Sequence, residues 1–494
     1  MTKHPGGIVL TSLQLDRESH VPMFQQLYQA IRQAVLSRGL LPGARLPSTR
    51  TLAKELEISR NTVVMAYEQL LSEGYVEGQI GSGSYISRFL PDELLAGRLE
   101  TEKLQAEPGH EIKYRPKRYL AHAPMKIWKG RGGLPRAFRF GVPALDHFPY
   151  STWNRILNKY WRSEPQALLN YGRIAGYRPL CEALAMYLQI ARGVRCEPEQ
   201  IIIVSGSQQG LDLTCKVLLN PSDTVWMEDP GYHGARAPFL AAGAKIIPVP
   251  LDEEGLDVTR AEELSPQARL AFVTPSHQFP LGMTMSLTRR LRLLEWASRV
   301  GAWIIEDDYD SEFRYSGRPL AALQGLDHDG RVIYIGTFSK VLFPSLRLGY
   351  LVVPPNLVDD FTAARAMSDQ HSSLIEQAVV TDLLTEGHFS RHIRNMRALY
   401  QERQQAVIKA VDKYLGPRLD VHPDNAGMHL VGWLSKDMND ETVAQEAVTH
   451  GVDVLPLSVF GSNPLPRPGL LLGYAAINEA QIQEGIERLG KALK

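Results

Sequence analysis

The N-terminal part of the chain carries apolar side chains at helical spacing. Within 21–39, apolar positions recur every three or four residues and form one face, which predicts an amphipathic helix. Two further helical patterns occupy 48–58 and 59–74, and each starts with a serine, Ser48 or Ser59, that can cap a helix N-terminus. The pattern therefore predicts three helices, with a helix-turn-helix formed by the second and third.

The pattern after the third helix changes from helical to strand-like. Two β-prone runs, 75–77 and 85–87, flank a glycine- and serine-rich turn, which is typical of a β wing. We therefore predict a winged helix-turn-helix domain over 1–88. In 89–136 the periodicity fades while proline, glycine and basic residues accumulate, so we interpret this stretch as a basic linker.

The remaining part of the chain alternates short apolar runs with helical patterns. Buried parallel strands that are covered by helices on both faces have this pattern. We therefore predict one large α/β domain over 137–494 with a largely parallel sheet. The predicted strands are 201–204, 224–227, 245–249, 270–274, 302–306 and 332–336.

Composition excludes several classes of protein. Of the 494 residues, 44% are hydrophobic and 22% are charged, so disorder, collagen and coiled coil are excluded. No apolar run approaches the roughly 18 residues of a membrane helix, and the N-terminal apolar stretch is too short for a signal peptide. We therefore expect a cytoplasmic protein with no membrane partner.

The three cysteines lack metal-binding spacing, so we expect buried thiols and no metal site; they are Cys181, Cys196 and Cys215.

Charge restricts where nucleic acid could bind. Lys plus Arg and Asp plus Glu both total 54, so the formal net charge is zero and any nucleic-acid binding must be local. Nine basic residues and no acidic one lie between Lys113 and Arg139. Two interpretations of this run stay open: a solvated linker, or an auxiliary contact to DNA phosphates or between domains.

The third predicted helix has the polar N-terminus that a DNA reader needs. A helix fits the major groove when short polar or cationic residues lie near its N-terminus, and Arg60 is the best candidate for a base contact. An ordinary surface of a small helical domain is the alternative. The candidate DNA-binding residues are Ser59, Arg60, Asn61 and Thr62 for the bases, Arg45, Ser48 and Arg50 for phosphates, and Gly81 and Gly83 at the wing tip.

Three segments of the large domain place polar residues at the ends of predicted strands. A strand runs into a helix through Ser207 and Gln208, where backbone N–H groups and the helix dipole attract a phosphate. Acidic residues, Asp307 among them, follow the strand 302–306 at the edge where α/β sheets bind ligands. A third strand ends at Lys340, whose amine can combine with an aldehyde. Hydroxyls and a guanidinium suited to a phosphate accompany it, namely Thr337, Ser339 and Arg347.

These motifs resemble two known families on one chain. The segment 21–86, with LPSTRTLA and SRNTVVMAYEQL, is similar to the winged helix-turn-helix of GntR-type repressors. The large domain resembles the fold type I aminotransferases, which depend on pyridoxal 5'-phosphate (PLP). Together with TPSHQFPLG, EDDYDSEFRY and GTFSKVLFPSLRLGY, the arrangement resembles the MocR subgroup of GntR-type transcription factors. The resemblance covers the chain except the linker.

The resemblance implies a role for each candidate cofactor residue. It implies that Lys340 bonds to the cofactor, that Asp307 keeps its pyridine nitrogen protonated, and that Tyr309 binds its ring hydroxyl. Glu306, Asp308 and Asp310 are by default helix caps or solvated charges. Tyr232 is expected to stack on the pyridine ring. Tyr171 is expected either to pack locally or to reach the phosphate in a neighbouring subunit, which would make the protein a homodimer.

The chain departs from the family pattern at several positions. His277, Gln278 and Phe279 replace the region of the asparagine that contacts the ring hydroxyl in ordinary aminotransferases. Leu471 replaces an arginine that commonly binds a substrate carboxylate, and leucine offers no substitute. Arg236 and Arg467 are possible replacements. Met65 takes the place of an arginine that helps some relatives to bind DNA.

Two hypotheses of function follow. The first is a transcriptional regulator that binds double-stranded operator DNA and senses PLP, or a PLP adduct with an amine or amino acid; its leading target is vitamin B6 homeostasis. The second is a catalytically active aminotransferase with a DNA-binding appendage. The loss of the arginine at Leu471 and the complete winged helix favour the first.

Overall fold

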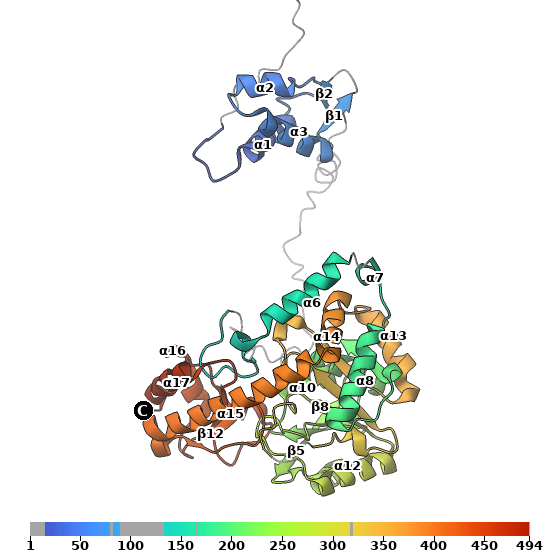
Figure 1. Cartoon of the computed structure of the whole chain (residues 1–494), viewed down its shortest axis with the longest axis vertical. Helices are drawn as coiled ribbons and strands as arrows, with labels where there is room; N and C mark the ends of the chain where they lie inside the picture. The colour runs from blue at the N-terminus through green and yellow to red at the C-terminus, as the bar shows by residue number, and fades with distance from the viewer. Residues whose placement is uncertain (1–14, 80–82, 89–132, 164–165, 317–319, 494) are drawn as a thin grey trace, which may run out of the picture. The chain divides into compact units, whose positions relative to one another are not determined.

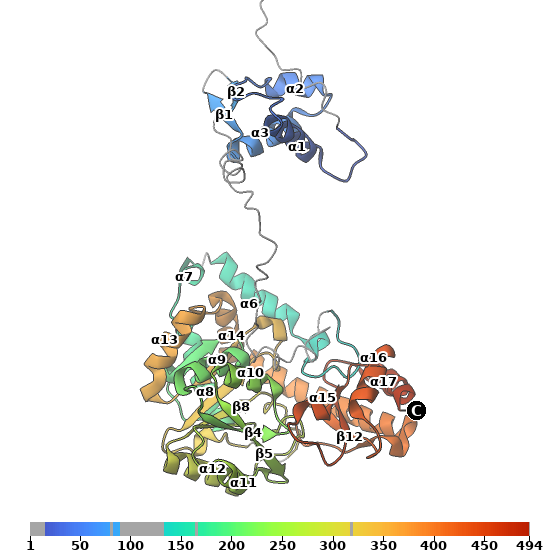
Figure 2. The same cartoon turned by 180° about the vertical axis from the view of Figure 1, so that it is seen from behind.

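The structure is a computed structural model of the whole chain, in which two compact units are distinguished. Residues 1–115 form the first unit and residues 116–494 form the second. Figures 1 and 2 show both units from opposite sides, and each unit is described by itself. The residues described are 15–79, 83–88, 133–163, 166–316 and 320–493.

The first unit contains the three helices that the sequence predicts. They are α1 (Met23–Leu36), α2 (Thr49–Glu55) and α3 (Arg60–Ser72). Both predicted caps are confirmed, because the Ser48 and Ser59 hydroxyls accept hydrogen bonds from the backbone N–H groups of Thr51 and Thr62, each at 3.1 Å. These bonds satisfy N–H groups that a helix start leaves unpaired.

The predicted wing is also present in the first unit. Strands β1 (Val76–Gln79) and β2 (Gly83–Ile86) pair antiparallel. On α3, Ala66 is buried, whereas Leu71 remains 39% exposed. The small Ala66 side chain joins the core that α3 shares with α1 and α2, so the buried face is centred slightly away from Leu71. The core of this unit includes Leu27, Ile31, Val35, Leu52, Val63, Tyr67 and Leu70.

The second unit is built on an eight-stranded sheet, and all six predicted strands are confirmed. The strands are β3 (Ile201–Val204), β4 (Thr224–Asp229), β5 (Lys245–Asp252), β6 (Gly255–Leu256), β7 (Leu270–Val273), β8 (Trp303–Asp308), β9 (Val332–Thr337) and β10 (Gly349–Val352). Their order is β3-β10-β9-β8-β7-β4-β5-β6. Strands β5, β4, β7, β8 and β9 are mutually parallel, whereas β10 runs antiparallel to β9 and β3. The carboxyl ends of the parallel strands therefore meet at one edge.

Helices cover both faces of this sheet, which confirms the predicted α/β class. One face packs against α9 (Ser207–Leu218), α10 (His233–Ala241) and α13 (Val358–Ser368). Helices α11 (Val258–Leu264) and α12 (Leu287–Val300) pack on the other face. The large core that includes Ile201, Ile203 and Tyr334 adds α8 (Arg178–Arg192) and α14 (Leu374–Thr385).

A second, antiparallel sheet near the C-terminus was not predicted from the sequence. It comprises β11 (Asp420–Val421), β12 (His429–Trp433), β14 (Gly469–Gly473) and β13 (Leu455–Pro456), in that order. The long helix α15 (His388–Tyr414), with α16 (Asp440–Thr449) and α17 (Glu479–Ala492), packs against it. Figure 2 shows this C-terminal segment in orange and red beside the central sheet.

The remaining helices are short or lie near the start of the second unit. Helices α6 (Tyr150–Arg162) and α7 (Gln166–Leu169) precede the sheet. The 3-10 helices are Leu145–His147, Pro198–Gln200, Gln324–Leu326, Pro344–Leu346, Pro355–Leu357, Gly416–Arg418 and Leu457–Phe460. Across the described ranges, no helix combines the length and apolar character of a membrane span. All three cysteines are buried and free, as predicted.

The burial of the acidic residues at the end of β8 differs from the prediction. Glu306 and Asp308, expected as caps or solvated charges, are both buried. Glu306 accepts hydrogen bonds from the backbone N–H groups of Leu323 and Gln324, both at 2.8 Å. Asp308 accepts a 2.8 Å hydrogen bond from Arg192 Nε. Neither carboxylate is solvated, so that part of the expectation was wrong, although Glu306 binds the first N–H groups of the 3-10 helix Gln324–Leu326 as a cap would. Partners from distant segments offset the cost of burying both carboxylates.

Candidate functional site

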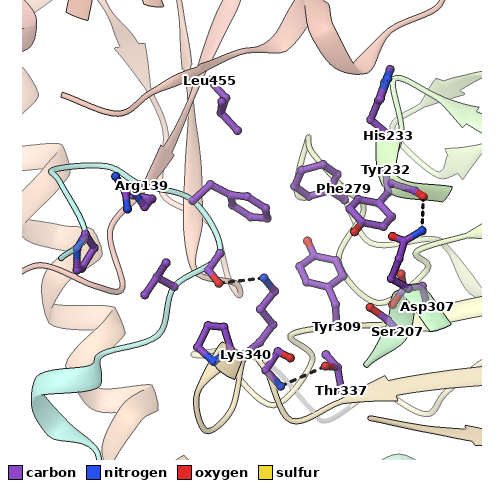
Figure 3. Close-up of a pocket in the computed structure, with 18 of the residues that line it drawn as sticks. Arg139, Ser207, Tyr232, His233, Phe279, Asp307, Tyr309, Thr337, Lys340 and Leu455 are labelled. Atoms are coloured by element: carbon purple, nitrogen blue, oxygen red, sulfur yellow. Dashed lines mark hydrogen bonds between the residues drawn. The ribbon is translucent and has the colours of Figure 1, made fainter. Parts of the chain in front are cut away.

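A cavity of about 580 Å³ lies at the carboxyl ends of the parallel strands. Its walls come from the ends of β7, β8 and β9 and from the start of α9, at the edge where open α/β sheets bind ligands. Figure 3 shows these side chains converging on one space. Nine of the ten cofactor residues predicted from the sequence line it: Ser207, Gln208, Tyr232, Asp307, Tyr309, Thr337, Ser339, Lys340 and Arg347.

One end of the cavity is suited to an anion. Helix α9 begins at Ser207, directly after Gly206, whose φ of 98° is a left-handed value that favours glycine. A Cβ on Gly206 would lie 3.4 Å from the Arg347 guanidinium, which itself donates to the Ser205 carbonyl at 2.7 Å. The Ser339 backbone N–H donates to the Thr337 hydroxyl at 3.1 Å. A helix N-terminus, a guanidinium and two hydroxyl-bearing residues therefore surround one small volume.

A buried carboxylate without a partner faces the same cavity. Asp307 lies on β8 and is 5% exposed. Among the residues that the structure describes, none makes a hydrogen bond to its Oδ1. Burial, with the nearby Asp308 charge, raises the pKa of Asp307 to about 7, while Lys340 opposes this shift. An unpaired buried carboxylate is costly, so this oxygen fits a ligand that brings an N–H group.

Lys340 reaches the centre of the cavity from the loop after β9. Its Nζ donates to the Gly141 carbonyl at 2.9 Å and lies 5.3 Å from the ring centroid of Phe140. Gly141 has a φ of 80°, and a Cβ there would lie 2.7 Å from the Lys340 Nζ. A side chain at position 141 would therefore displace the lysine amine from this position.

Tyr309 is held by a buried histidine. The Nδ1 atom of His277 lies 3.0 Å from the Tyr309 hydroxyl and 3.0 Å from an Asp310 oxygen, and its Nε2 atom lies 3.3 Å from Asp424. Burial alone lowers the pKa of His277, but the Asp310 and Asp424 carboxylates outweigh it and raise this pKa to about 10. The ring is then protonated on both nitrogens at neutral pH. The Tyr309 oxygen accepts from it, so the tyrosine keeps its own proton for a ligand.

This network answers two points that the sequence raised. Asp310, expected as a cap or solvated charge, is 1% exposed and lies against the ring of His277, so that expectation was wrong. His277 lies in the segment that replaces the asparagine of ordinary aminotransferases, and its Nδ1 atom contacts the Tyr309 hydroxyl. Gly427 makes the space for it, since a Cβ at Gly427 would lie 2.2 Å from His277 Cε1.

The two other predicted aromatic residues have different environments. Tyr232 directly precedes α10, lines the cavity and lies 5.8 Å from Phe279 between ring centroids. Tyr171 does not line the cavity of its own chain and is 83% exposed. Its ring lies 6.2 Å from His371, edge to face. A role for Tyr171 in a neighbouring subunit remains a prediction.

Sequence reasoning missed one wall of the cavity. Residues of the segment 133–145 line it, among them Arg139, Phe140 and Gly141, together with Gly133 and Pro135 from the predicted linker. The rest of that linker, 89–132, lies outside the described residues. The local sequence gives no signal for this wall, since the segment reaches Lys340 only through the tertiary fold. Leu455 and Phe460, near the second sheet, complete the same side.

The position of the missing arginine is closed by apolar packing. Leu471 on β14 is fully buried and packs with Phe279, Leu457 and Phe460. Neither proposed replacement lines the cavity. Arg236 donates to the Ser462 hydroxyl at 2.5 Å, and Arg467 donates to the Leu434 carbonyl at 2.7 Å.

The candidate DNA-binding residues gather at the start of α3 and around α2. Ser59, Arg60 and Asn61 are exposed, and the Arg60 Nε atom lies 3.5 Å from the Thr49 hydroxyl. Ser59 serves mainly as the helix cap, and its hydroxyl also lies 2.8 Å from that of Thr62. Arg60 and Asn61 are therefore the side chains of this group that remain most available for a base edge.

The predicted phosphate contacts lie beside this helix start. Ser48 and Arg50 lie at the start of α2, and the Arg50 side chain is exposed. Arg45 packs against the wing, because a Cβ on Gly83 would lie 3.3 Å from its Nε atom. Gly81 lies outside the described residues. Met65 is 42% exposed on α3, so the position is accessible but carries no charge.

Comparison with known proteins assigns both units to families. Residues 24–86 match the gntR family of bacterial regulatory proteins, and residues 142–489 match class I and II aminotransferases. The helix-turn-helix of the gntR family binds DNA, and class I and II aminotransferases generally depend on PLP.

Two of the solved structures that match this chain are aminotransferases. The α-aminoadipate aminotransferase LysN from Thermus thermophilus, complexed with N-(5'-phosphopyridoxyl)-L-leucine, has a TM-score of 0.69 and 31% identity over 76% of this chain and 97% of its own. The kynurenine aminotransferase of Pyrococcus horikoshii has a TM-score of 0.68 and 29% identity, over 81% of this chain and 98% of its own.

Full-length relatives carry both units on one chain. The probable rhizopine catabolism regulatory protein MocR of Rhizobium meliloti is 42% identical over 97% of this chain and 95% of its own. The pyridoxine biosynthesis transcriptional regulator PdxR of Corynebacterium glutamicum is 32% identical, covering 95% of both chains. Fold and site thus define a transcription regulator in which a winged helix-turn-helix is joined to an aminotransferase-like domain. The chain belongs to the MocR type of the GntR-family regulators.

We expect the stability of the protein to depend on the proton of His277. Its pKa is raised from 6.5 to about 10 in the folded state, so its contribution is fully present below pH 6.5 and is lost as pH rises to 10. His277→Gln should therefore lose less free energy of unfolding between pH 7 and pH 10 than the wild type, by more than about 1 kcal/mol. Urea denaturation at both values measures this difference. His422→Gln, at a side chain 76% exposed, is the control and should behave as wild type.

Proposed function

We propose that this regulator binds operator DNA through α3 and senses PLP through the cavity at Lys340. The convergence of nine predicted residues on one cavity supports this proposal, with an unpaired buried carboxylate, Asp307, facing the space beside the lysine. The related aminotransferase from Thermus thermophilus is complexed with a phosphopyridoxyl derivative of leucine, which also supports a PLP site. Such a regulator acts in the cytoplasm, where its operator lies.

The residues of the cavity fit each part of this cofactor. The start of α9 at Ser207, together with Arg347, would hold its phosphate, because the site offers backbone N–H groups and a guanidinium. Asp307 would accept the pyridine N–H, and Tyr309 would donate to the ring oxygen. Tyr232 would stack on the ring. The group supplies an aldehyde carbon that combines with a primary amine, either that of Lys340 or that of an effector.

The contact between Lys340 and Gly141 provides a route from the cavity to the linker. A primary amine that combines with an aldehyde loses two N–H hydrogens as water leaves, so the Lys340 nitrogen would no longer donate to the Gly141 carbonyl as its amine does here. Gly141 belongs to the segment 133–145, which continues N-terminally into the linker. Reaction at Lys340 therefore removes a hydrogen bond from the segment that leads to the DNA-binding unit. A signal requires such a difference between two states.

We also propose that the working form is a homodimer. The 83% exposed side chain of Tyr171 supports this arrangement, since its hydroxyl is available to the site of a second copy. Vitamin B6 homeostasis is the pathway that we propose first. The relationship to a regulator named for pyridoxine biosynthesis, which extends over 95% of both chains, supports this choice.

The central test is whether Lys340 captures the cofactor. Borohydride treatment of the full chain incubated with PLP should leave a pyridoxyl label on the peptide that contains Lys340, detected by mass spectrometry. Lys340→Ala should lose the label and the effect of PLP on DNA binding, while keeping the wild-type circular dichroism spectrum. Lys216→Ala, at a half-exposed lysine on α9, is the control. A wild-type chain without the label would refute the proposal, and turnover of an amino acid to a keto acid would favour the aminotransferase hypothesis.

Gly141→Ala tests the route from the cavity to the linker. The added methyl group would lie 2.7 Å from the Lys340 Nζ, so it should displace the amine and slow labelling by PLP. Gly301→Ala is a matched control, because Gly301 also has a left-handed φ, 71°, but nothing within 4 Å of the new Cβ. The two variants share the cost of backbone strain, so slower labelling of Gly141→Ala alone assigns the effect to contact with the lysine. Equal rates in both variants would contradict it.

Arg60→Ala tests the DNA-reading assignment. A bidentate base contact is worth about 1–3 kcal/mol of discrimination, so this variant should lose affinity for an operator selected from random DNA and keep its affinity for unrelated sequence. Arg50→Ala, at a predicted phosphate contact, should weaken binding to both DNA molecules and reduce the salt dependence. Both are measured by fluorescence anisotropy at fixed ionic strength. An unchanged operator affinity for Arg60→Ala would show that Arg60 does not contact the bases.

A further inference from the structure

The cavity extends beyond the residues assigned to the cofactor, into a region with apolar walls. We call this region the apolar wall; it consists of Phe140, Val142, Leu145, Phe279, Leu455 and Phe460. Figure 3 shows Leu455 and Phe279 on the side of Lys340 and Tyr309 that faces away from Thr337. We propose that the apolar wall binds the body of an effector that is an apolar primary amine without a carboxylate. This inference rests on the proposed function of the cavity and defines the chemical class of its second ligand.

Phe279 forms the centre of the apolar wall. Its ring centroid lies 4.9 Å from that of Phe140 and 5.0 Å from that of Phe460. The rings of Tyr232 and Tyr309 lie at 5.8 and 6.0 Å, both edge to face. Interlocked rings of this kind present a rigid surface that gains free energy by covering apolar area and offers few hydrogen bonds. A hydrocarbon or aryl body suits this surface better than a polyhydroxylated one.

Both guanidinium groups that line the cavity already have carboxylate or carbonyl partners. Arg139 donates through Nε and Nη2 to the Asp453 carboxylate, at 2.7 and 2.5 Å. Arg347 lies at the anion end and donates to the Ser205 carbonyl. A ligand carboxylate would have to displace Asp453, which is held in place by the fold. Among the described lining residues, neither arginine therefore offers a ready carboxylate site.

The packing around Leu471 closes the other approach to a carboxylate site. Leu471 is fully buried behind Phe279 and Phe460, and its strand neighbours are apolar side chains from β12 and β13. A carboxylate placed against this surface would lose its water without gaining a donor, which is unfavourable. An amino acid therefore binds less well than the amine derived from it.

The amine end of the ligand has a suitable environment beside the apolar wall. The Lys340 ammonium group now lies against the face of Phe140 and donates to the Gly141 carbonyl. A carbonyl oxygen and an aromatic face are the partners that any primary ammonium group can use. A ligand amine that enters from the apolar wall meets these same partners next to the cofactor residues.

A matched pair of probes tests this inference. The PLP-treated full chain is titrated with 2-phenylethylamine and with L-phenylalanine, which differ by one carboxylate, and binding is followed by the visible absorption of the chain and by operator affinity. The amine should bind roughly tenfold more tightly or better. Glucosamine, an amine with a polyhydroxylated body, should bind more weakly than 2-phenylethylamine. Equal or tighter binding of phenylalanine overturns the absence of a carboxylate site, and equal binding of glucosamine overturns the apolar class.

A variant of the apolar wall provides a second measurement. Leu455→Arg adds a guanidinium to the wall and should shift the ratio of the two affinities toward phenylalanine by about tenfold. Leu287→Arg, at a side chain 60% exposed on α12, should keep the wild-type ratio. If Leu455→Arg does not fold, the ratio of the two affinities in the wild type still tests the inference. A chain that carries the pyridoxyl label but does not prefer the amine refutes this inference alone, whereas a chain without the label refutes the proposed function as well.

Discussion

The unpaired carboxylate of Asp307 is the constraint on which the chemistry of the cavity depends. Four acidic residues lie within five positions at the end of β8, and three of them have hydrogen-bond partners inside the fold. Glu306 accepts two backbone hydrogen bonds, Asp308 accepts one from Arg192, and Asp310 lies against a buried imidazole. Asp308 Oδ1 also lacks a partner among the described residues, but Asp308 is paired with Arg192 through its other oxygen, whereas Asp307 forms no ion pair within the described ranges. A fold that maintains this cost at one oxygen is prepared for a cationic N–H group at that point.

The lysine and the carboxylate are held from opposite sides of the cavity by different parts of the chain. Asp307 is fixed by the parallel sheet, which forms from local apolar runs. The Lys340 amine is positioned by Gly141, which belongs to a segment that enters the second unit before the sheet begins. Ligand binding between them must therefore affect two segments at once, one rigid and one continuous with the linker. The proposed sensing role would use this asymmetry, since only the segment with Gly141 continues along the chain into the linker.

The parts of the fold that could be predicted are those specified by local patterns. The six strands and the caps Ser48 and Ser59 follow from residues within a few positions of each other, and the structure confirms them. The cavity residues at strand ends could be found for the same reason, since the carboxyl ends of parallel strands share one edge. Their binding roles remain predictions. The burial of Glu306 could not be predicted, because its partners are contributed by another segment.

Contacts between distant segments explain the other differences. The antiparallel sheet β11–β14 consists of very short strands, two of them only two residues long, whose pairing carries little local signal. The wall formed by 133–145 could not be predicted, because this segment contacts Lys340 only in the folded chain. His277 was recognised as a departure from the family pattern, but its charge depends on Asp310 and Asp424, which lie far from it in the sequence. Electrostatic roles of this kind require the tertiary structure.

The loss of a carboxylate site is consistent with the change from an enzyme fold to a regulator. An aminotransferase must hold an amino acid in one orientation through many turnovers, which favours a guanidinium bound to its carboxylate. A sensor has only to bind its ligand differently in two conformations, and it needs no orientation for catalysis. The position at Leu471 can then be used for packing, which joins β14 to the aromatic cluster around Phe279. Under the proposed function, Asp307 and Lys340 stay polar because capture of the ligand would depend on them, whereas the apolar wall would match the body of the signal molecule.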